Sequence, residues 1–154
     1  MARILVVTDA WRPQVNGVVR TLEQTAAAAV ALGHEMIFLT PEGYRSVPMP
    51  TYPDIRLALV TPAELGRRIA TERPDYIHIA TEGPLGLMVR RWCLGQGHPF
   101  TTSYHTRFPE YLRLRAPVPL AWSYAALRRF HNAGAGIMVS TAEVHAELEA
   151  RGFE

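Results

Sequence analysis

The sequence contains no lysine and a single cysteine, Cys93, among its 154 residues. One cysteine cannot form an intramolecular disulfide or build a cysteine-rich metal site. No apolar run approaches the roughly 20 residues that span a bilayer, and the N-terminus does not have the layout of a signal peptide. These absences predict a cytoplasmic protein rather than a disulfide-stabilised secreted domain or a membrane-spanning one.

Neither sign of charge dominates, because 16 arginines stand against 14 acidic residues and the net charge is +2. So small a basic excess does not favour a nucleic-acid partner. Apolar types make up 48% of the chain and charged types 19%, a balance typical of globular proteins. Since the length suits one α/β domain, we treat residues 1–154 as one domain.

Short apolar runs alternate with segments of helical periodicity along the whole chain. The proline-rich segment 41–54 is the exception, and we expect a long surface loop there. Alternating strands and helices predict an α/β fold with a doubly wound, Rossmann-like parallel sheet, in which ligands collect at the carboxyl ends of the strands. Six strands are predicted, over residues 4–8, 36–40, 55–60, 76–80, 100–104 and 137–139.

The loop after the first predicted strand is the most informative stretch, although it lacks both the G-x-G-x-x-G and the P-loop patterns. Gly17 and Val18 open the next helix, where free N–H groups and the missing Cβ would suit a phosphate; an ordinary turn glycine is the alternative. Asn16 would order the loop, and Arg20 is a candidate phosphate contact. Asp9 could bind a hydroxyl, hold Arg12 or Arg20, or cap a turn.

Further candidates follow the later strands. His105 comes directly after the fifth strand and could bond a sugar hydroxyl or a phosphate, shuttle a proton, or be a structural histidine. We place its neighbours Tyr104 and Arg107 in the same binding site. Glu82 follows the fourth strand and could reach this cleft or cap the helix after it. The histidines form no H-x-x-x-H or H-E-x-x-H pattern, so we predict no metal site.

Residues 107–130 interleave arginines with aromatic and aliphatic residues. Such a mixture is compatible with an anionic membrane surface, which would place the protein at the cytoplasmic face of the inner membrane. An amphipathic helix pair with a solvated basic face explains the same pattern, and we favour it because membrane-surface helices show a stronger segregation of faces.

Taken together, these motifs resemble a known family. The run RILVVTDAWRPQVNGVVRTLEQTAAAAVALGHEMIFLTPEG resembles the N-terminal domain of retaining GT-B glycosyltransferases of family four. The segments TYPDIRLAL, HIATEGPLGL, SYHTRFPEY and MVSTAEVHAEL continue the resemblance in the same order, so that it covers essentially the whole chain. Within that family the sequence is most similar to bacterial GDP-mannose-dependent α-mannosyltransferases, with sulfoquinovosyl transferases as near relatives.

The resemblance implies two Rossmann-like domains that face a cleft, the N-terminal one holding the acceptor and the C-terminal one the nucleotide sugar. Asn16 and Gly17 would meet the donor diphosphate, His105 would position the transferring sugar or stabilise its oxocarbenium-like centre, and Asp9 could orient the acceptor. A hexosyl group, mannosyl or a related sugar, would pass from a nucleotide-diphosphate sugar to a lipid or glycan acceptor, without a metal or other cofactor.

The donor motif of the family belongs to the C-terminal domain, which this chain lacks, so we expect the chain alone not to transfer sugar. Two other interpretations of the function remain open. One is a non-catalytic Rossmann-like ligand-binding module, and the other is half of a sugar-nucleotide 2-epimerase, which shares the two-domain fold.

Overall fold

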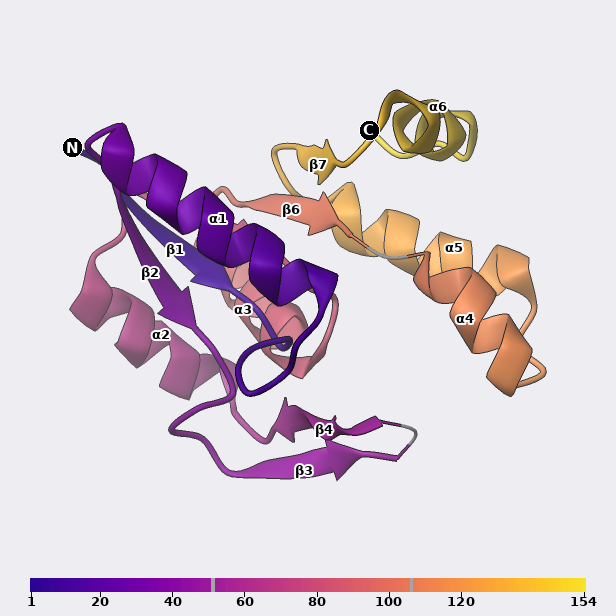
Figure 1. Cartoon of the computed structure of the whole chain (residues 1–154), viewed down its shortest axis with the longest axis horizontal. Coiled ribbons are helices and arrows are strands. Elements are labelled where there is room, and N and C mark those ends of the chain that lie inside the picture. Colours follow the sequence, from indigo (N-terminus) through magenta and orange to yellow (C-terminus); the bar gives the residue numbers. More distant parts are fainter. Residues whose placement is uncertain (51, 106) are drawn as a thin grey trace.

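A five-stranded sheet forms the centre of the structure, with the strand order β2-β1-β5-β6-β7 (Figure 1). Every neighbouring pair of these strands runs parallel. The strands are β1 (Arg3–Val7), β2 (Glu35–Leu39), β5 (Tyr76–Ile79), β6 (Thr101–Tyr104) and β7 (Ile137–Val139). The computed structural model describes residues 1–50, 52–105 and 107–154.

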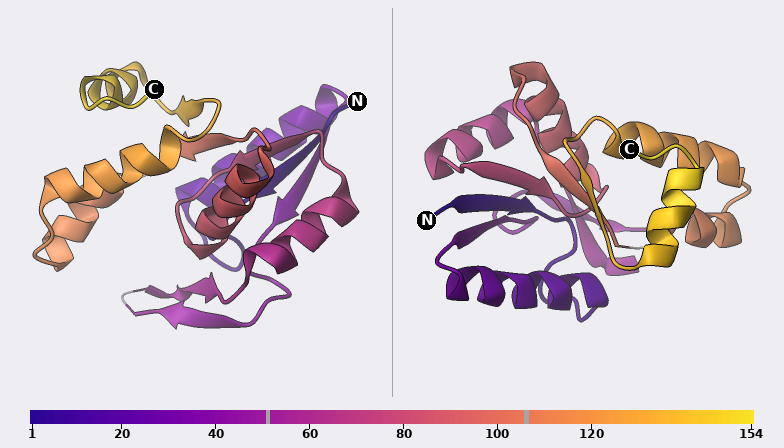
Figure 2. Two further views of the ribbon diagram at one scale, coloured as in Figure 1. Left: turned by 180° about the vertical axis from the view of Figure 1, so that it is seen from behind. Right: turned by 90° about the horizontal axis from the view of Figure 1, so that it is seen from above.

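Helices cover both faces of this sheet, as the two views of Figure 2 show. Helix α1 lies on one face, and α2 and α3 lie together on the other. Helices α4 and α5 pack on each other beyond β6, and α6 packs beside β7. The helices are α1 (Gly17–Ala31), α2 (Pro62–Glu72), α3 (Pro84–Gln96), α4 (Phe108–Arg115), α5 (Leu120–His131) and α6 (Ala142–Ala150).

The first strand shows why its residues form a central strand. Leu5, Val6 and Val7 are all buried, as expected for a parallel strand that is covered on both faces. Successive side chains point to opposite faces, so that Leu5 and Val7 belong to the large core under α2 and α3, whereas Val6 packs with Leu22 of α1. The predicted α/β, doubly wound, Rossmann-like fold class is therefore confirmed.

The predictions for residues 41–60 need correction. Part of the expected loop is the strand β3 (Ser46–Met49), which pairs antiparallel with β4 (Tyr52–Ala58) in a separate two-stranded sheet. The strand predicted over 55–60 thus lies in this hairpin and not in the parallel sheet. Each strand of a two-stranded ribbon keeps one edge without ladder partners, and proline is tolerated at such an edge or at a bulge. Pro48 lies opposite Arg56, and the register of the pairing shifts directly after it, between Pro48 and Met49.

The topology also fixes where a ligand would be expected. From β1 the chain crosses by α1 to β2, and from β5 it crosses by α3 to β6 on the opposite side. In open α/β sheets the ligand crevice lies at such a reversal, outside the carboxyl ends of the strands. The loops that follow β1, β5 and β6 meet this edge, which we call the switch-point edge. In the described ranges, no helix combines the length and the apolar character that crossing a bilayer requires.

Candidate functional site

The N-terminus of α1 stands at the switch-point edge and is exposed. Asn16 is its N-cap, because its Oδ1 accepts a hydrogen bond from the N–H of Val19 at 3.0 Å. Its Nδ2 donates to Gln14 Oε1 at 2.9 Å within the same loop. Among the hydrogen bonds of the described residues, none uses the N–H groups of Gly17 and Val18.

Gly17 is not required by the fold. Its backbone does not adopt a left-handed conformation, and a Cβ built on it would meet no atom within 4 Å. The first turn of α1 carries no acidic side chain, so the partial positive charge of the helix end is not neutralised from within the helix. Arg20 lies in the same first turn and is exposed. These features leave an open position that suits an anion.

Asp9 connects the first loop to the start of α3. Its carboxylate is buried and accepts hydrogen bonds from the N–H of Leu85 and the hydroxyl of Thr81, both at 2.8 Å, and a longer one from the N–H of Gly86 at 3.4 Å. The N-cap residue of α3, Gly83, makes no side-chain capping bond, so Asp9 supplies that cap from 74 positions earlier in the chain. A Cβ at Gly83 would collide with this carboxylate.

These contacts settle what Asp9 does within the domain. Sequence reasoning offered a link to Arg12 or Arg20, but Arg12 pairs with Glu23 instead, and Asp9 caps a helix. Burial raises the pKa of Asp9, although the hydrogen bonds from Leu85 and Thr81 act against this rise. A role in orienting an acceptor stays a prediction.

Glu82 belongs to a series of hydrogen-bonded side chains that connects the β5–α3 loop to α5 and β6. Glu82 Oε1 lies 3.0 Å from Nε2 of His131, and His131 Nδ1 lies 2.8 Å from the hydroxyl of Thr102 on β6. His131 is completely buried, whereas the Glu82 side chain keeps 26% of its surface exposed. Glu82 therefore does not cap α3, one of the two predicted alternatives, and it reaches the switch-point edge.

His105 follows β6 at the same edge and is half-buried. Burial lowers its pKa, and the negative charge of Glu82 partly opposes that effect. Its Nε2 is buried and has no hydrogen-bond partner among the described residues. The neutral ring therefore presents a polar atom that a ligand hydroxyl could satisfy.

A second histidine lies close to His105. His78 of β5 is buried, with Nδ1 at 2.8 Å from the hydroxyl of Thr101 and Nε2 at 2.8 Å from the hydroxyl of Ser103. Burial lowers the pKa of His78 to about 4, with a smaller contribution from His105. His78 is thus neutral at physiological pH and supports β6 from within the sheet.

The remaining two predicted binding residues have other neighbours. Tyr104 is 3% exposed and packs in the core formed by α5, α6 and the C-terminal segment, together with Tyr124 and Phe153. Both faces of β6 are covered, so a residue at its end is buried despite its place in the sequence. Arg107 is exposed, and its guanidinium lies 3.0 Å from Glu147 Oε2 of α6. Neither residue contacts Asp9, Glu82 or the α1 N-terminus among the described contacts.

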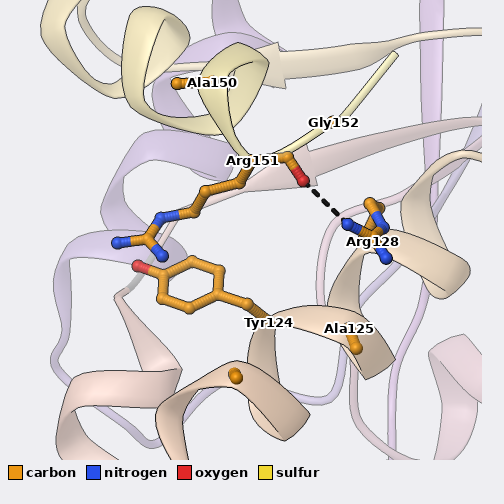
Figure 3. Close-up of a pocket in the computed structure, with 7 residues that line it drawn as sticks. Tyr124, Ala125, Arg128, Ala150, Arg151 and Gly152 are labelled. Atoms are coloured by element: carbon orange, nitrogen blue, oxygen red, sulfur yellow. Dashed lines mark hydrogen bonds between the residues drawn. The ribbon is translucent and has the colours of Figure 1, made fainter.

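A surface hollow of about 560 Å³ lies elsewhere, between α5 and α6 (Figure 3). Arg151 stacks over the ring of Tyr124 at 3.8 Å, and Arg128 donates to the carbonyl of Arg151 at 3.0 Å. None of the predicted site residues lines this hollow. Within the described ranges, no three His, Cys, Asp or Glu side chains gather as a metal site would need.

Sequence reasoning missed His131, Thr102 and His78. His131 carried a signal, since it is a polar residue next to Phe130 on the buried side of an amphipathic helix. Its partner could not be found in the same way, because Glu82 is 49 positions away.

A match to a protein family agrees with the α/β fold described above. The model of Glycosyltransferase Family 4 matches residues 15–154, a range that includes every candidate residue above except Asp9. A search of curated proteins returned no match. The family match does not distinguish among sugars, donors or acceptors, so similarity to mannosyltransferases stays a prediction. An α/β sheet of this topology and a match over most of its length show that the chain belongs to Glycosyltransferase Family 4.

Proposed function

We propose that this chain forms the acceptor-side domain of a retaining GT-B glycosyltransferase, and that the exposed N-terminus of α1 binds the diphosphate of a nucleotide sugar. One observation carries the proposal: Gly17 opens the helix at the switch-point edge in a conformation and a space that do not require glycine. A glycine that the fold does not need is best explained by a ligand that approaches the backbone closely.

The chemistry of transfer accounts for such a site. When the glycosyl bond breaks, negative charge develops on the departing nucleotide diphosphate, and preorganised dipoles aimed at that charge lower the barrier. The N–H groups of Gly17 and Val18 and the dipole of α1 supply such dipoles, and the exposed Arg20 adds a cation. Asn16 keeps the helix end in position by its cap.

His105 would bond a hydroxyl of the transferring sugar or stabilise its oxocarbenium-like centre. Support comes from its place after β6 and from the buried Nε2 that no described residue satisfies. Glu82, with one oxygen held by His131, would accept a hydrogen bond from a hydroxyl through the other. Asp9 would orient the acceptor indirectly, since its carboxylate fastens the first loop to α3.

The finer parts of the proposal come from the resemblance. A second Rossmann-like domain would hold the nucleotide of the donor, and mannose or a related hexose would pass to a lipid or glycan acceptor, with no cofactor. Leu114 of α4 and Trp122 of α5 are exposed by 83% and 71%. They would provide peripheral contact with the cytoplasmic face of a membrane if the acceptor is a lipid.

The test is a screen of the full-length protein against a panel of nucleotide sugars and lipid or glycan acceptors, with released nucleotide diphosphate as the readout. We expect acceptor-dependent release, and a large loss of turnover in His105→Ala. Binding of nucleotide sugar without release would indicate a non-catalytic module. Release of free sugar or its epimer without an acceptor would indicate an epimerase. Either result would refute the proposal.

A further inference from the structure

We propose that His131 is a positioning residue which, supported by Thr102, fixes the carboxylate of Glu82 at the switch-point edge beside His105. The inference deepens the proposed function, on which its catalytic consequence rests. The structural part, an oriented carboxylate held through a buried histidine, stands by itself and can be tested by itself.

The hydrogen bonds determine where one hydrogen of the His131 ring must lie. An ionised carboxylate only accepts, so Nε2 of His131 must carry the hydrogen that is donated to Glu82 Oε1 at 3.0 Å. In the neutral ring Nδ1 is then the acceptor and receives the hydroxyl hydrogen of Thr102 at 2.8 Å. Thr102 thereby selects the tautomer of His131, just as a hydrogen bond to one ring nitrogen selects the role of the other.

The surroundings of His131 prevent its ring from turning. The rings of Phe130, Tyr104 and Phe153 lie around it at centroid distances of 5.1, 6.0 and 6.0 Å. His131 has no exposed surface, and both of its nitrogens are satisfied. A ring that is packed on several sides and bonded at both nitrogens holds its partner in one orientation.

Glu82 acts on the groups nearest to it through its charge. It raises the pKa of His105, against the larger lowering by burial, and it also contributes to the raised pKa of Asp9 and of Tyr104. The other ionisable group that faces His105 is His78, which is neutral at physiological pH. Glu82 is therefore the one described carboxylate whose position sets the charge felt by His105.

Stability alone gives no reason for the pair. A buried ion pair or hydrogen-bonded carboxylate contributes no more, in general, than apolar side chains of the same volume. An apolar residue at position 131 would extend the cluster of Tyr104, Leu127 and Phe153 that is already there. What the histidine adds is a fixed direction for Glu82.

The first experiment is histidine-selective ¹⁵N and ¹³C NMR of the full-length protein, which needs no substrate. We expect Nε2 of His131 to carry a hydrogen, because its partner Glu82 Oε1 accepts. Glu82→Gln removes the carboxylate charge, so His105 should titrate at a lower pH. His131→Phe removes the hydrogen bond that holds Glu82. Thr102→Val removes the bond that favours the Nε2–H tautomer of His131. Both variants should therefore shift the titration of His105 in the same direction by a smaller amount.

The chain offers a matched control for Thr102. Thr101 precedes it on β6 and bonds a buried histidine nitrogen at the same 2.8 Å, but its partner is His78. Thr101→Val removes an equivalent hydroxyl without touching Glu82, so it should leave the titration of His105 unchanged. Thr102→Val also keeps the inference testable if His131→Phe fails to fold, because it exchanges one branched side chain for another of the same shape.

The second experiment measures transfer kinetics of the same variants. We expect Thr102→Val to lower kcat about tenfold, the effect of losing one hydrogen bond in a network that serves a charged group, and Thr101→Val to stay within about twofold of the wild type. The inference is overturned if Glu82→Gln shifts His105 but Thr102→Val and His131→Phe do not, or if His131 is the Nδ1–H tautomer. A wild type without transfer activity would count against the proposed function, whereas the NMR results would still decide the role of His131.

Discussion

Replacing Gly17 by alanine separates a structural glycine from a ligand-binding one. In the free domain the new methyl group points into open space, since no atom lies within 4 Å of it. The backbone at Gly17 is not left-handed, so alanine introduces no strain. A substitution of this kind restricts the unfolded chain and stabilises a protein by about 0.4–1 kcal/mol. For a chain of this size we expect the melting temperature to rise by roughly 1–4 °C.

Transfer activity should change in the opposite direction. If a diphosphate approaches the N–H groups of Gly17 and Val18, the added methyl group pushes it away from them. Hydrogen bonds to a charged group contribute about 1.5–3 kcal/mol each, so the loss of one lowers kcat/KM by about tenfold to a hundredfold. Thus Gly17→Ala is predicted to be more stable and much less active than the wild type.

The assay combines thermal unfolding with initial rates of nucleotide release by the full-length protein. Gly95→Ala is the matched control, because Gly95 also lies in a helix, is exposed, and would place its Cβ at least 4 Å from other atoms. It stands near the C-terminal end of α3, away from the switch-point edge, so it should gain similar stability and keep its activity. Equal activity of the Gly17 and Gly95 variants would refute the anion site.

Three further predictions concern buried groups. Asp9→Ala removes two short hydrogen bonds to a buried carboxylate. The free energy of unfolding should fall by about 3 kcal/mol, and the melting temperature by roughly 6–12 °C. A smaller loss would show that the helix cap is not needed. Because the pKa of His78 is about 4 when folded and about 6.5 when unfolded, the unfolded chain binds more protons in between. The free energy of unfolding should therefore be highest above pH 6.5 and fall by about 3 kcal/mol towards pH 4. In urea titrations at several pH values, the free energy of unfolding of His78→Gln should depend less on pH than that of the wild type. Burial raises the pKa of Cys93 to about 12, so a thiol reagent at neutral pH should modify it only after unfolding.

The sequence alone was sufficient for the fold class. Burial of a parallel strand on both faces favours a continuous apolar run. Ile4 to Val7 has that character, and in β5 the apolar Ile77 and Ile79 flank His78, the one polar residue between them. The same reasoning failed for residues 55–60, whose apolar content is similar. Whether a strand belongs to the central sheet depends on which strand pairs with it, and for β4 that partner is β3. The prolines of segment 41–54 had indicated a loop where β3 lies.

For the candidate site, the sequence predicted features that depend on a short local segment, but not contacts between residues far apart in the chain. Gly17 and Asn16 could be placed because a helix N-terminus is a local structure, and the topology alone brings it to the switch-point edge. The actual contacts of Asp9 and Glu82 could not be predicted, since their partners Leu85 and His131 lie 76 and 49 positions further along the chain. A carboxylate that follows a strand is equally suited to a ligand, to a helix N-terminus or to a histidine. The choice among these depends on which donor the packing brings within about 3 Å, and that is a property of the folded chain.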